Sequence, residues 1–173
     1  RGKVIVSGVG TSGFIARRAA HILSVSGTPA LFVHAADGMH GTFGALRDGD
    51  LLIVLSKGGG SSEVNTLAAL AKAKSIPVIA LTSAPTSTLA TSADVSVVLP
   101  SDSQSDPGGL IAMGSTLAHA AWLDAMAYTL MRIKGYGWDQ VLFTHPGGAL
   151  GKMATLPEPL ATLDFAPRTP AAG

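Results

Sequence analysis

Glycine- and hydroxyl-rich segments follow three apolar runs of this sequence, and such segments are suited to binding phosphate. The clearest covers residues 56–63, where three glycines precede two serines. Glycines let the backbone approach an anion, and the free N–H groups at the start of a helix bind it. It is not a P-loop, because the lysine precedes the glycines and no G-K-[ST] follows. The residues predicted to hold phosphate here are Ser56, Lys57, Gly59, Ser61 and Ser62.

Two further segments complete the predicted site. Residues 8–13 read GVGTSG, so Gly10, Thr11 and Ser12 lie in a turn with the spacing of a dinucleotide fingerprint. A nicotinamide dinucleotide site usually has an acidic residue at the end of the next strand, to bind the ribose. The next apolar run of this sequence does not end in one. A dinucleotide site and a turn without a ligand remain alternatives. Thr82 opens the third segment and adds hydroxyl groups.

Three residues could transfer protons. Glu63 follows the serines of the clearest segment, where a carboxylate could act as a general base or simply complement a helix dipole. His145 lies in the run THPGGALG, whose proline and glycines predict a rigid loop, and His40 lies in the loop MHGTFG. An ordinary surface role is the alternative for both histidines.

Short apolar runs alternate with longer amphipathic ones, which predicts a parallel α/β sheet. Because parallel strands end at one edge, the three segments should converge there. The predicted strands are 4–6, 30–34, 51–55, 78–82 and 95–99. The predicted helices are 14–26, 61–74, 87–92, 113–133 and 138–143.

The composition narrows the function classes. A length of 173 residues with 47% hydrophobic residues suits one domain, which we place at residues 1–155, with a proline- and alanine-rich tail at 156–173. A net charge of +1 argues against nucleic acid or an anionic membrane as partner. The chain has no cysteine, which excludes disulfides and thiolate metal sites and favours an intracellular location. No apolar run is long enough to span a bilayer.

Four segments resemble the sugar isomerase (SIS) domain of the arabinose 5-phosphate isomerases. They are residues 8–13 (GVGTSG), 27–34 (GTPALFVH), 40–44 (HGTFG) and 145–151 (HPGGALG), the last being the most specific. The resemblance implies a three-layer α-β-α sandwich around a five-stranded, flavodoxin-like (doubly wound) parallel sheet. It also implies a homo-oligomer, a dimer or tetramer, whose sites form between subunits. We expect a cytoplasmic location. We expect the SIS domain without the CBS domains that often follow it.

The implied activity interconverts an aldose phosphate and a ketose phosphate through an enediol, without a metal or organic cofactor. The sequence departs from the family at two catalytic positions. Thr11 stands where the family has lysine, and Gln104 where it has glutamate. Gly58 stands where the family has a serine. Ser115 and Thr116 keep the last two hydroxyls of the family run that aligns with residues 111–116. Lys57 could supply the missing positive charge, and Asp102 or Asp106 the missing carboxylate.

The sequence therefore predicts an isomerase of a phosphorylated or similarly anionic sugar, which need not be arabinose 5-phosphate. Glu63 and His145 are its expected catalytic groups, with His40 as a further candidate. A phosphosugar sensor without catalysis is the alternative, because the two departures remove proton-transfer groups.

Overall fold

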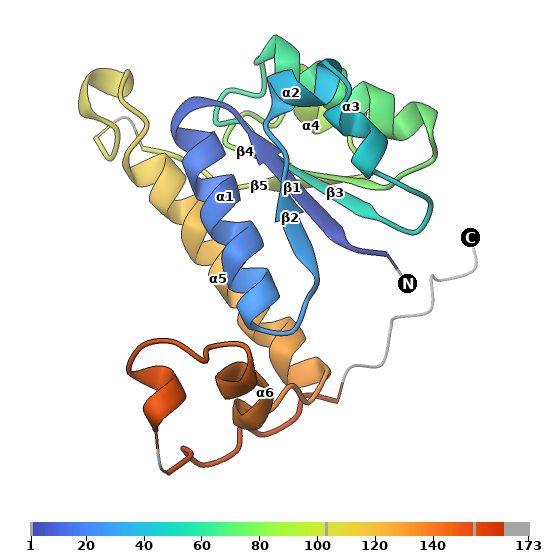
Figure 1. Cartoon of the computed structure of the whole chain (residues 1–173). Coiled ribbons are helices and arrows are strands. Elements are labelled where there is room, and N and C mark those ends of the chain that lie inside the picture. The colour runs from blue at the N-terminus through green and yellow to red at the C-terminus, as the bar shows by residue number, and fades with distance from the viewer. Residues whose placement is uncertain (1, 103, 154, 165–173) are drawn as a thin grey trace.

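Five short apolar runs form one parallel sheet in the computed structural model, which describes residues 2–102, 104–153 and 155–164 (Figure 1). The strand order is β2-β1-β3-β4-β5, and neighbouring strands pair in parallel. The strands are β1 (Val4–Gly8), β2 (Ala30–Phe32), β3 (Leu51–Leu55), β4 (Val78–Thr82) and β5 (Val95–Val98). The predicted five-stranded parallel α/β fold is confirmed.

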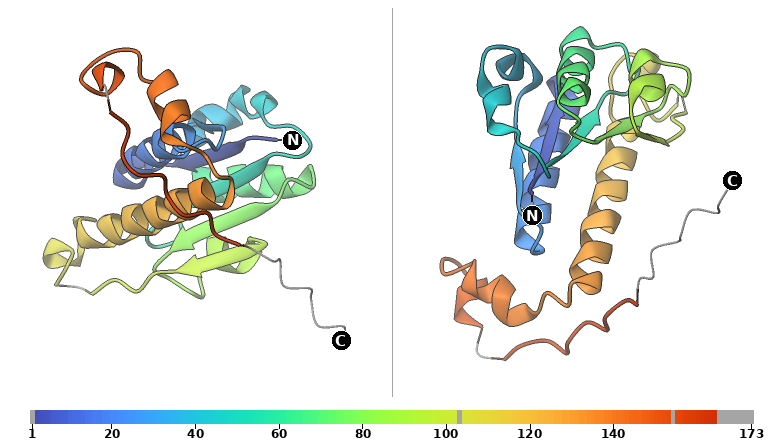
Figure 2. Two further views of the ribbon diagram at one scale, coloured as in Figure 1. Left: turned by 90° about the horizontal axis from the view of Figure 1, so that it is seen from below. Right: turned by 90° about the vertical axis from the view of Figure 1, so that its right-hand side faces the viewer.

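Helices cover both faces of this sheet, as the views in Figures 1 and 2 agree. The helices α1 (Gly10–Val25) and α5 (Gly114–Ile133) lie side by side on one face. The other face carries α2 (Ala35–Met39), α3 (Ser62–Ala73) and α4 (Thr88–Ser92). Strands buried on both faces read as continuous apolar runs, which is why β1, β3 and β4 show no polar alternation.

Alternate residues of the strands build two hydrophobic cores. Ile5 and Val54 face α3, whereas Val6, Ile53 and Leu55 face α1 and α5. The edge strand β5 is the exception, because its side chains are mostly exposed. The sheet therefore has a well-covered centre and one edge strand whose side chains are largely exposed.

A line of buried side chains four residues apart runs along α5 and fixes its inner face. It consists of Ser115, His119, Leu123, Ala127 and Met131. Arg18 of α1 donates two hydrogen bonds, of 2.5 and 2.9 Å, to the carboxylate of Asp124 on α5. The two helices are thus joined at their surface as well as through the core.

The structure differs from the sequence prediction at the first two turns. Helix α1 begins at Gly10, so Ser12 belongs to its first turn rather than to a preceding loop. Strand β2 ends at Phe32, and the following segment, expected as a loop, forms α2 and a 3₁₀ turn over Thr42–Ala45. Short helices of this kind lack a clear hydrophobic period.

Beyond α5 the chain forms α6 (Trp138–Phe143), a 3₁₀ turn (Leu150–Lys152) and an extended segment. The indole N–H of Trp138 donates to the Glu158 carbonyl at 2.9 Å, and Arg132 Nε donates to the Ala161 carbonyl at 2.8 Å. A cavity of about 540 Å³ lies between this segment and the end of α5. The described part of the predicted tail is therefore held in place, while 165–173 lie outside the described residues; the domain boundary at 155 stays a prediction.

Within the described ranges, no helix is both long and apolar enough to cross a membrane.

Candidate functional site

The loop between β3 and α3 folds back on itself. The hydroxyl oxygens of Ser56 and Ser61 lie 3.2 Å apart across it. Gly59 has a φ of +63°, and a Cβ there would lie 2.0 Å from the Ser87 hydroxyl oxygen. A glycine is therefore required at this position, both for its backbone conformation and for space.

Neighbouring polar groups hold this loop from two sides. The buried Thr82 hydroxyl donates to the Lys57 carbonyl at 2.9 Å, and the Asn65 side-chain amide donates to the Gly59 carbonyl at 3.1 Å. Thr82 therefore positions the loop from the end of β4; its predicted contact with phosphate stays a prediction. Sequence reasoning did not single out Asn65, because one amide within a helix carries no distinctive signal.

The first turn of α3 presents its N–H groups at the end of this loop. In the described chain, the side chain of Ser61 makes no capping hydrogen bond to α3. The first N–H groups of a helix lack intrahelical partners, and they attract anions. Ser62 donates to the Glu63 carboxylate at 3.2 Å, which places this half-buried acid in the same turn. A candidate anion site and a candidate base thus lie next to each other.

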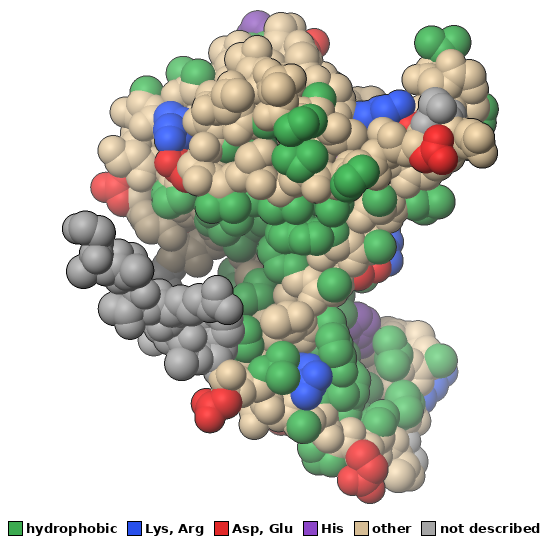
Figure 3. All heavy atoms as spheres, turned by 180° about the vertical axis from the view of Figure 1, so that it is seen from behind, with side chains coloured by type: hydrophobic (Ala, Val, Ile, Leu, Met, Phe, Trp, Pro, Cys, Tyr) green, Lys and Arg blue, Asp and Glu red, His purple; other side chains and the backbone are tan. Residues whose placement is uncertain are grey.

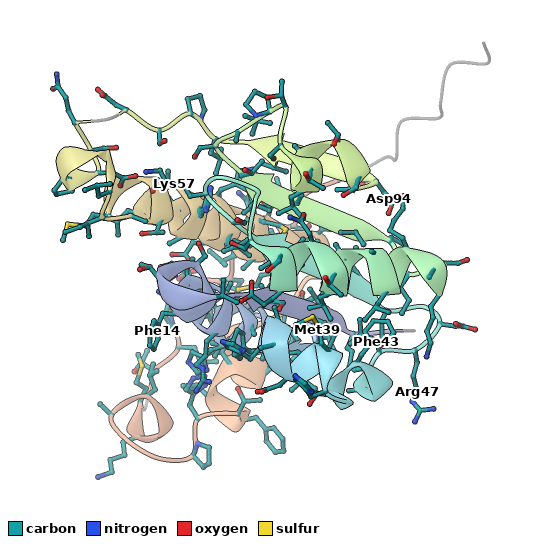
Figure 4. All side chains as sticks on the ribbon, turned by 90° about the horizontal axis from the view of Figure 1, so that it is seen from above. Phe14, Met39, Phe43, Arg47, Lys57 and Asp94 are labelled. Atoms are coloured by element: carbon teal, nitrogen blue, oxygen red, sulfur yellow. The ribbon has the colours of Figure 1, made fainter. Side chains whose placement is uncertain are left out.

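The N-terminus of α5 is different, because Asp106 fills it. The buried Asp106 carboxylate accepts N–H hydrogen bonds from Met113 at 2.7 Å and Ser115 at 3.1 Å. Its second oxygen lies 2.5 Å from the Lys57 ammonium, which also donates to the Gly109 carbonyl at 3.4 Å. Figure 4 shows Lys57 reaching toward the loop before α5.

This pair bears on two sequence hypotheses. Lys57 and Asp106 were candidates to supply the two charges that the family has and that this chain lacks at Thr11 and Gln104, yet they bind each other. The Lys57 ammonium, together with the N–H groups of Ser115 and Met113, holds the pKa of Asp106 well below its usual range. Asp106 is therefore a carboxylate at neutral pH, and it compensates the positive charge of Lys57. Because 49 residues separate Lys57 from Asp106, the local sequence gives no sign that they pair.

The other predicted residues near α5 have mixed environments. Gln104 is exposed, and its backbone N–H donates to the Asp102 carboxylate at 2.9 Å. Ser115 is buried at the start of α5. The Thr116 hydroxyl donates to the Met113 carbonyl at 2.8 Å within the helix turn. Of the three side chains, that of Gln104 is the most accessible to a ligand.

Gly10, Thr11 and Ser12 form the first turn of α1 at the same edge of the sheet. Thr11 is exposed and Ser12 is buried, while Gly10 has a φ of +55°. A cavity of about 280 Å³ opens beside this turn, lined by Gly10, Gly13, Phe14, Arg17, Phe32 and His34. The Arg17 guanidinium lies 4.9 Å from the centre of the Phe32 ring.

The two candidate histidines lie in different parts of the molecule. His40 is exposed just after α2, in the helical layer that also contains Glu63. His145 comes two residues after the end of α6. Helix α6 lies at the far end of α5 from the strand ends (Figures 1 and 2). Because α5 has 20 residues, it is about 30 Å long. One chain therefore does not bring His145 to Glu63.

The local contacts of His145 define its proton arrangement. Its Nδ1 lies 2.6 Å from the Val141 carbonyl, which can only accept, so Nδ1 carries the proton. The neutral ring then has its lone pair on Nε2. His145 is thus prepared as a proton acceptor through Nε2.

Among the described residues, no three histidine, cysteine or acidic side chains are grouped so as to hold a metal ion. Anion binding at the start of α3 and proton transfer by Glu63 and His145 stay predictions.

Comparison with known proteins identifies the family of this chain. The SIS domain profile matches residues 1–131. The arabinose 5-phosphate isomerase KdsD of Francisella tularensis is 38% identical over 156 residues, which are 90% of this chain and 48% of that protein. The KdsD protein of Pseudomonas aeruginosa is 35% identical over the same shares of the two chains. The chain thus spans about half the length of these curated relatives.

Solved structures with a similar fold include proteins of the same kind. An Escherichia coli protein in complex with arabinose 5-phosphate has a TM-score of 0.81 and 34% identity, over 84% of this chain and 78% of that one. A putative sugar-phosphate isomerase from Listeria monocytogenes has a TM-score of 0.79 and 37% identity, over 84% and 76%. The resemblance predicted from four short segments is confirmed over most of the described fold, and the chain belongs to the SIS domain family.

Proposed function

We propose that this chain is the SIS domain of a sugar-phosphate isomerase. The open N-terminus of α3, with Ser56, Ser61 and Ser62 around it and Glu63 in its first turn, is the observation that carries the proposal. A phosphate bound there would place the carbons of its sugar within reach of a carboxylate. The named activity of the KdsD relatives and the sugar phosphate bound by the Escherichia coli neighbour support the same class of ligand.

The proposed reaction moves one proton between adjacent carbons. The Glu63 carboxylate removes the proton from the carbon beside the carbonyl, and the carbonyl oxygen is protonated as the enediol forms. Glu63 returns the proton to the former carbonyl carbon, and the neighbouring hydroxyl becomes the new carbonyl. The sugar gains and loses no electrons overall, so the reaction needs only groups that transfer protons. His145 Nε2 is the group that we assign to proton transfer at the oxygens.

In this proposal, His145 comes from a second copy of the chain. Because α5 separates His145 from Glu63, we place His145 of one subunit at the Glu63 site of its neighbour. Exposed apolar side chains offer a contact surface: Figure 3 shows a hydrophobic band across the middle of the molecule, and Val95, Val98, Leu117 and Tyr128 are exposed on β5 and α5. Such a patch is typical of a protein interface.

Mixed oligomers test the assignment. Glu63→Gln and His145→Ala should each lower isomerisation of arabinose 5-phosphate, or of another C4 to C7 sugar phosphate found to be turned over, by on the order of 10² to 10⁴. Mixing the two inactive variants should restore activity, because some assembled sites then contain both intact residues. If both variants keep turnover within a few-fold of the parent, the roles are wrong. If the mixture stays inactive, the two residues do not share a site between subunits.

A phosphosugar sensor is the second candidate. Thr11 and Gln104 favour it, because neither side chain can replace the charged group found in the family at that position. Binding of sugar phosphates without exchange of solvent deuterium into them would support the sensor. Exchange that depends on Glu63 would support the isomerase.

A further inference from the structure

The loop before α5 contains an anion that belongs to the protein itself. The Asp106 carboxylate is fully buried and accepts two backbone N–H groups at the start of α5. The N-terminus of a helix as long as α5 would otherwise attract an external anion. Any phosphate that enters the site therefore finds the N-terminus of α5 occupied and that of α3 open.

Lys57 is held by the same carboxylate. Its ammonium lies 2.5 Å from Asp106 Oδ2, and its side chain is only 28% exposed. Because a buried charge without a partner is strongly destabilising, separating this pair to bind a phosphate would leave Asp106 uncompensated. The positive charge within the loop 56–61, that of Lys57, is thus balanced within the protein.

We infer that Asp106 is a specificity-determining residue, which cancels the positive charge of Lys57 at the anion site by pairing with it. The inference rests on the proposed function. The ligand's phosphate is then held by N–H and hydroxyl groups of the β3–α3 loop rather than by a free cation. Affinity depends on the fit of the phosphate to these donors, and only weakly on ionic strength.

The substitution Asp106→Asn tests this directly. The amide oxygen can still accept the N–H groups of α5, whereas the charge that holds Lys57 is gone. The affinity for inorganic phosphate, measured by calorimetry in 50 mM NaCl, should rise on the order of tenfold. The gain should largely disappear in 500 mM NaCl, because salt screens the released charge.

Asp94→Asn is the matched control. Asp94 pairs with Lys72, and both side chains are about two-fifths exposed. Asp94 lies across the molecule from Lys57 (Figure 4). The control changes the net charge by the same amount, so its phosphate affinity should stay within twofold of the parent.

The outcomes separate the inference from the proposed function. A folded Asp106→Asn variant that binds phosphate no better than the parent overturns the inference alone. Absence of phosphate binding in the parent and in both variants counts against the proposed function, and the inference falls with it. If Asp106→Asn does not fold, the salt dependence of the parent tests the inference instead. Its phosphate affinity should change less than threefold between 50 and 500 mM NaCl. A tenfold loss overturns the inference.

Discussion

The hydroxyl oxygens of Ser56 and Ser61 lie 3.2 Å apart, although a turn of glycines separates the two residues. Ser56 directly follows β3 and Ser61 directly precedes α3, so their contact joins the sheet to the helix that starts at the site. The proposed phosphate would meet both hydroxyls and the first N–H groups of α3 together.

Replacing these serines should weaken ligand binding. We expect Ser56→Ala and Ser61→Ala each to lower the affinity for inorganic phosphate by about tenfold or more, because a hydrogen bond to a charged group contributes about 1.5–3 kcal/mol. Isothermal titration calorimetry measures the change. Ser92→Ala, at an exposed serine of α4, should leave binding unaltered. Equal affinities in all three variants would place the phosphate elsewhere.

Adjacent glycines should differ sharply in their tolerance of alanine. At Gly59 a Cβ would meet Ser87 and the backbone has a φ of +63°, so Gly59→Ala should lower the free energy of unfolding by about 1–3 kcal/mol or more. At Gly58 a Cβ meets nothing within 4 Å, and Gly58→Ala should be nearly neutral. Urea unfolding of both variants checks the contrast, which similar stabilities would contradict.

His119 should make stability depend on pH. It is fully buried on α5, and neither ring nitrogen has a hydrogen-bond partner among the described residues. Burial lowers the pKa of His119, so the unfolded chain binds a proton more readily than the folded one. Stability should therefore fall as the pH drops below about 6.5, where an unfolded histidine becomes protonated.

The variant His119→Leu isolates this effect. It removes two unpaired polar atoms from the core, so we expect stability at pH 7 to rise by about 1 kcal/mol. Thermal melts between pH 5 and 7.5 should show a shallower loss toward acid than the parent. His21→Gln, at an exposed position of α1, should keep the slope of the parent. An unchanged slope in His119→Leu would contradict the prediction.

Asp50 should contribute to stability except in strong acid. Burial alone would raise the pKa of Asp50, but hydrogen bonds from the Lys3 ammonium at 2.6 Å and from the N–H groups of Lys3 and Arg47 outweigh it and lower the pKa. The contribution is present above the unfolded pKa of about 3.9 and is lost as the pH falls through the lower folded value.

Asp50→Asn should therefore be less stable than the parent at pH 7, by about 1–3 kcal/mol. The difference should shrink as the pH falls from 4 toward 2, because the parent's carboxyl then becomes protonated. Urea unfolding across this range measures it. Asp48→Asn, at an exposed neighbour, should match the parent throughout, and a constant difference for Asp50→Asn would argue against the ionised contact.

Most regular elements could be predicted from the sequence because short, continuous apolar runs alternate with longer amphipathic ones. The strands at residues 51–55 and 78–82 and the helix at 138–143 match the structure at both ends. The start of α1 was missed, since Gly10 and Gly13 read as a loop but form its first turn.

The candidate site was predicted in part. Ser56, Ser61 and Glu63 lie in one short segment, so their spacing alone brings them together. The pairing of Lys57 with Asp106 depends on how two distant loops pack, and nothing in the local sequence signals it. The position of His145 depends in the same way on the length and direction of α5.

The strand order has a consequence for how this chain can fold while it is made. Each strand after β1 pairs with one that has already been synthesised: β2 and β3 with β1, β4 with β3, and β5 with β4. The sheet can therefore grow in step with translation. Helix α5 is among the last elements to emerge, yet it covers Leu55 and Leu81. Until the ribosome has released it, a nascent chain exposes apolar sheet surface, the kind of intermediate that aggregates and that chaperones bind.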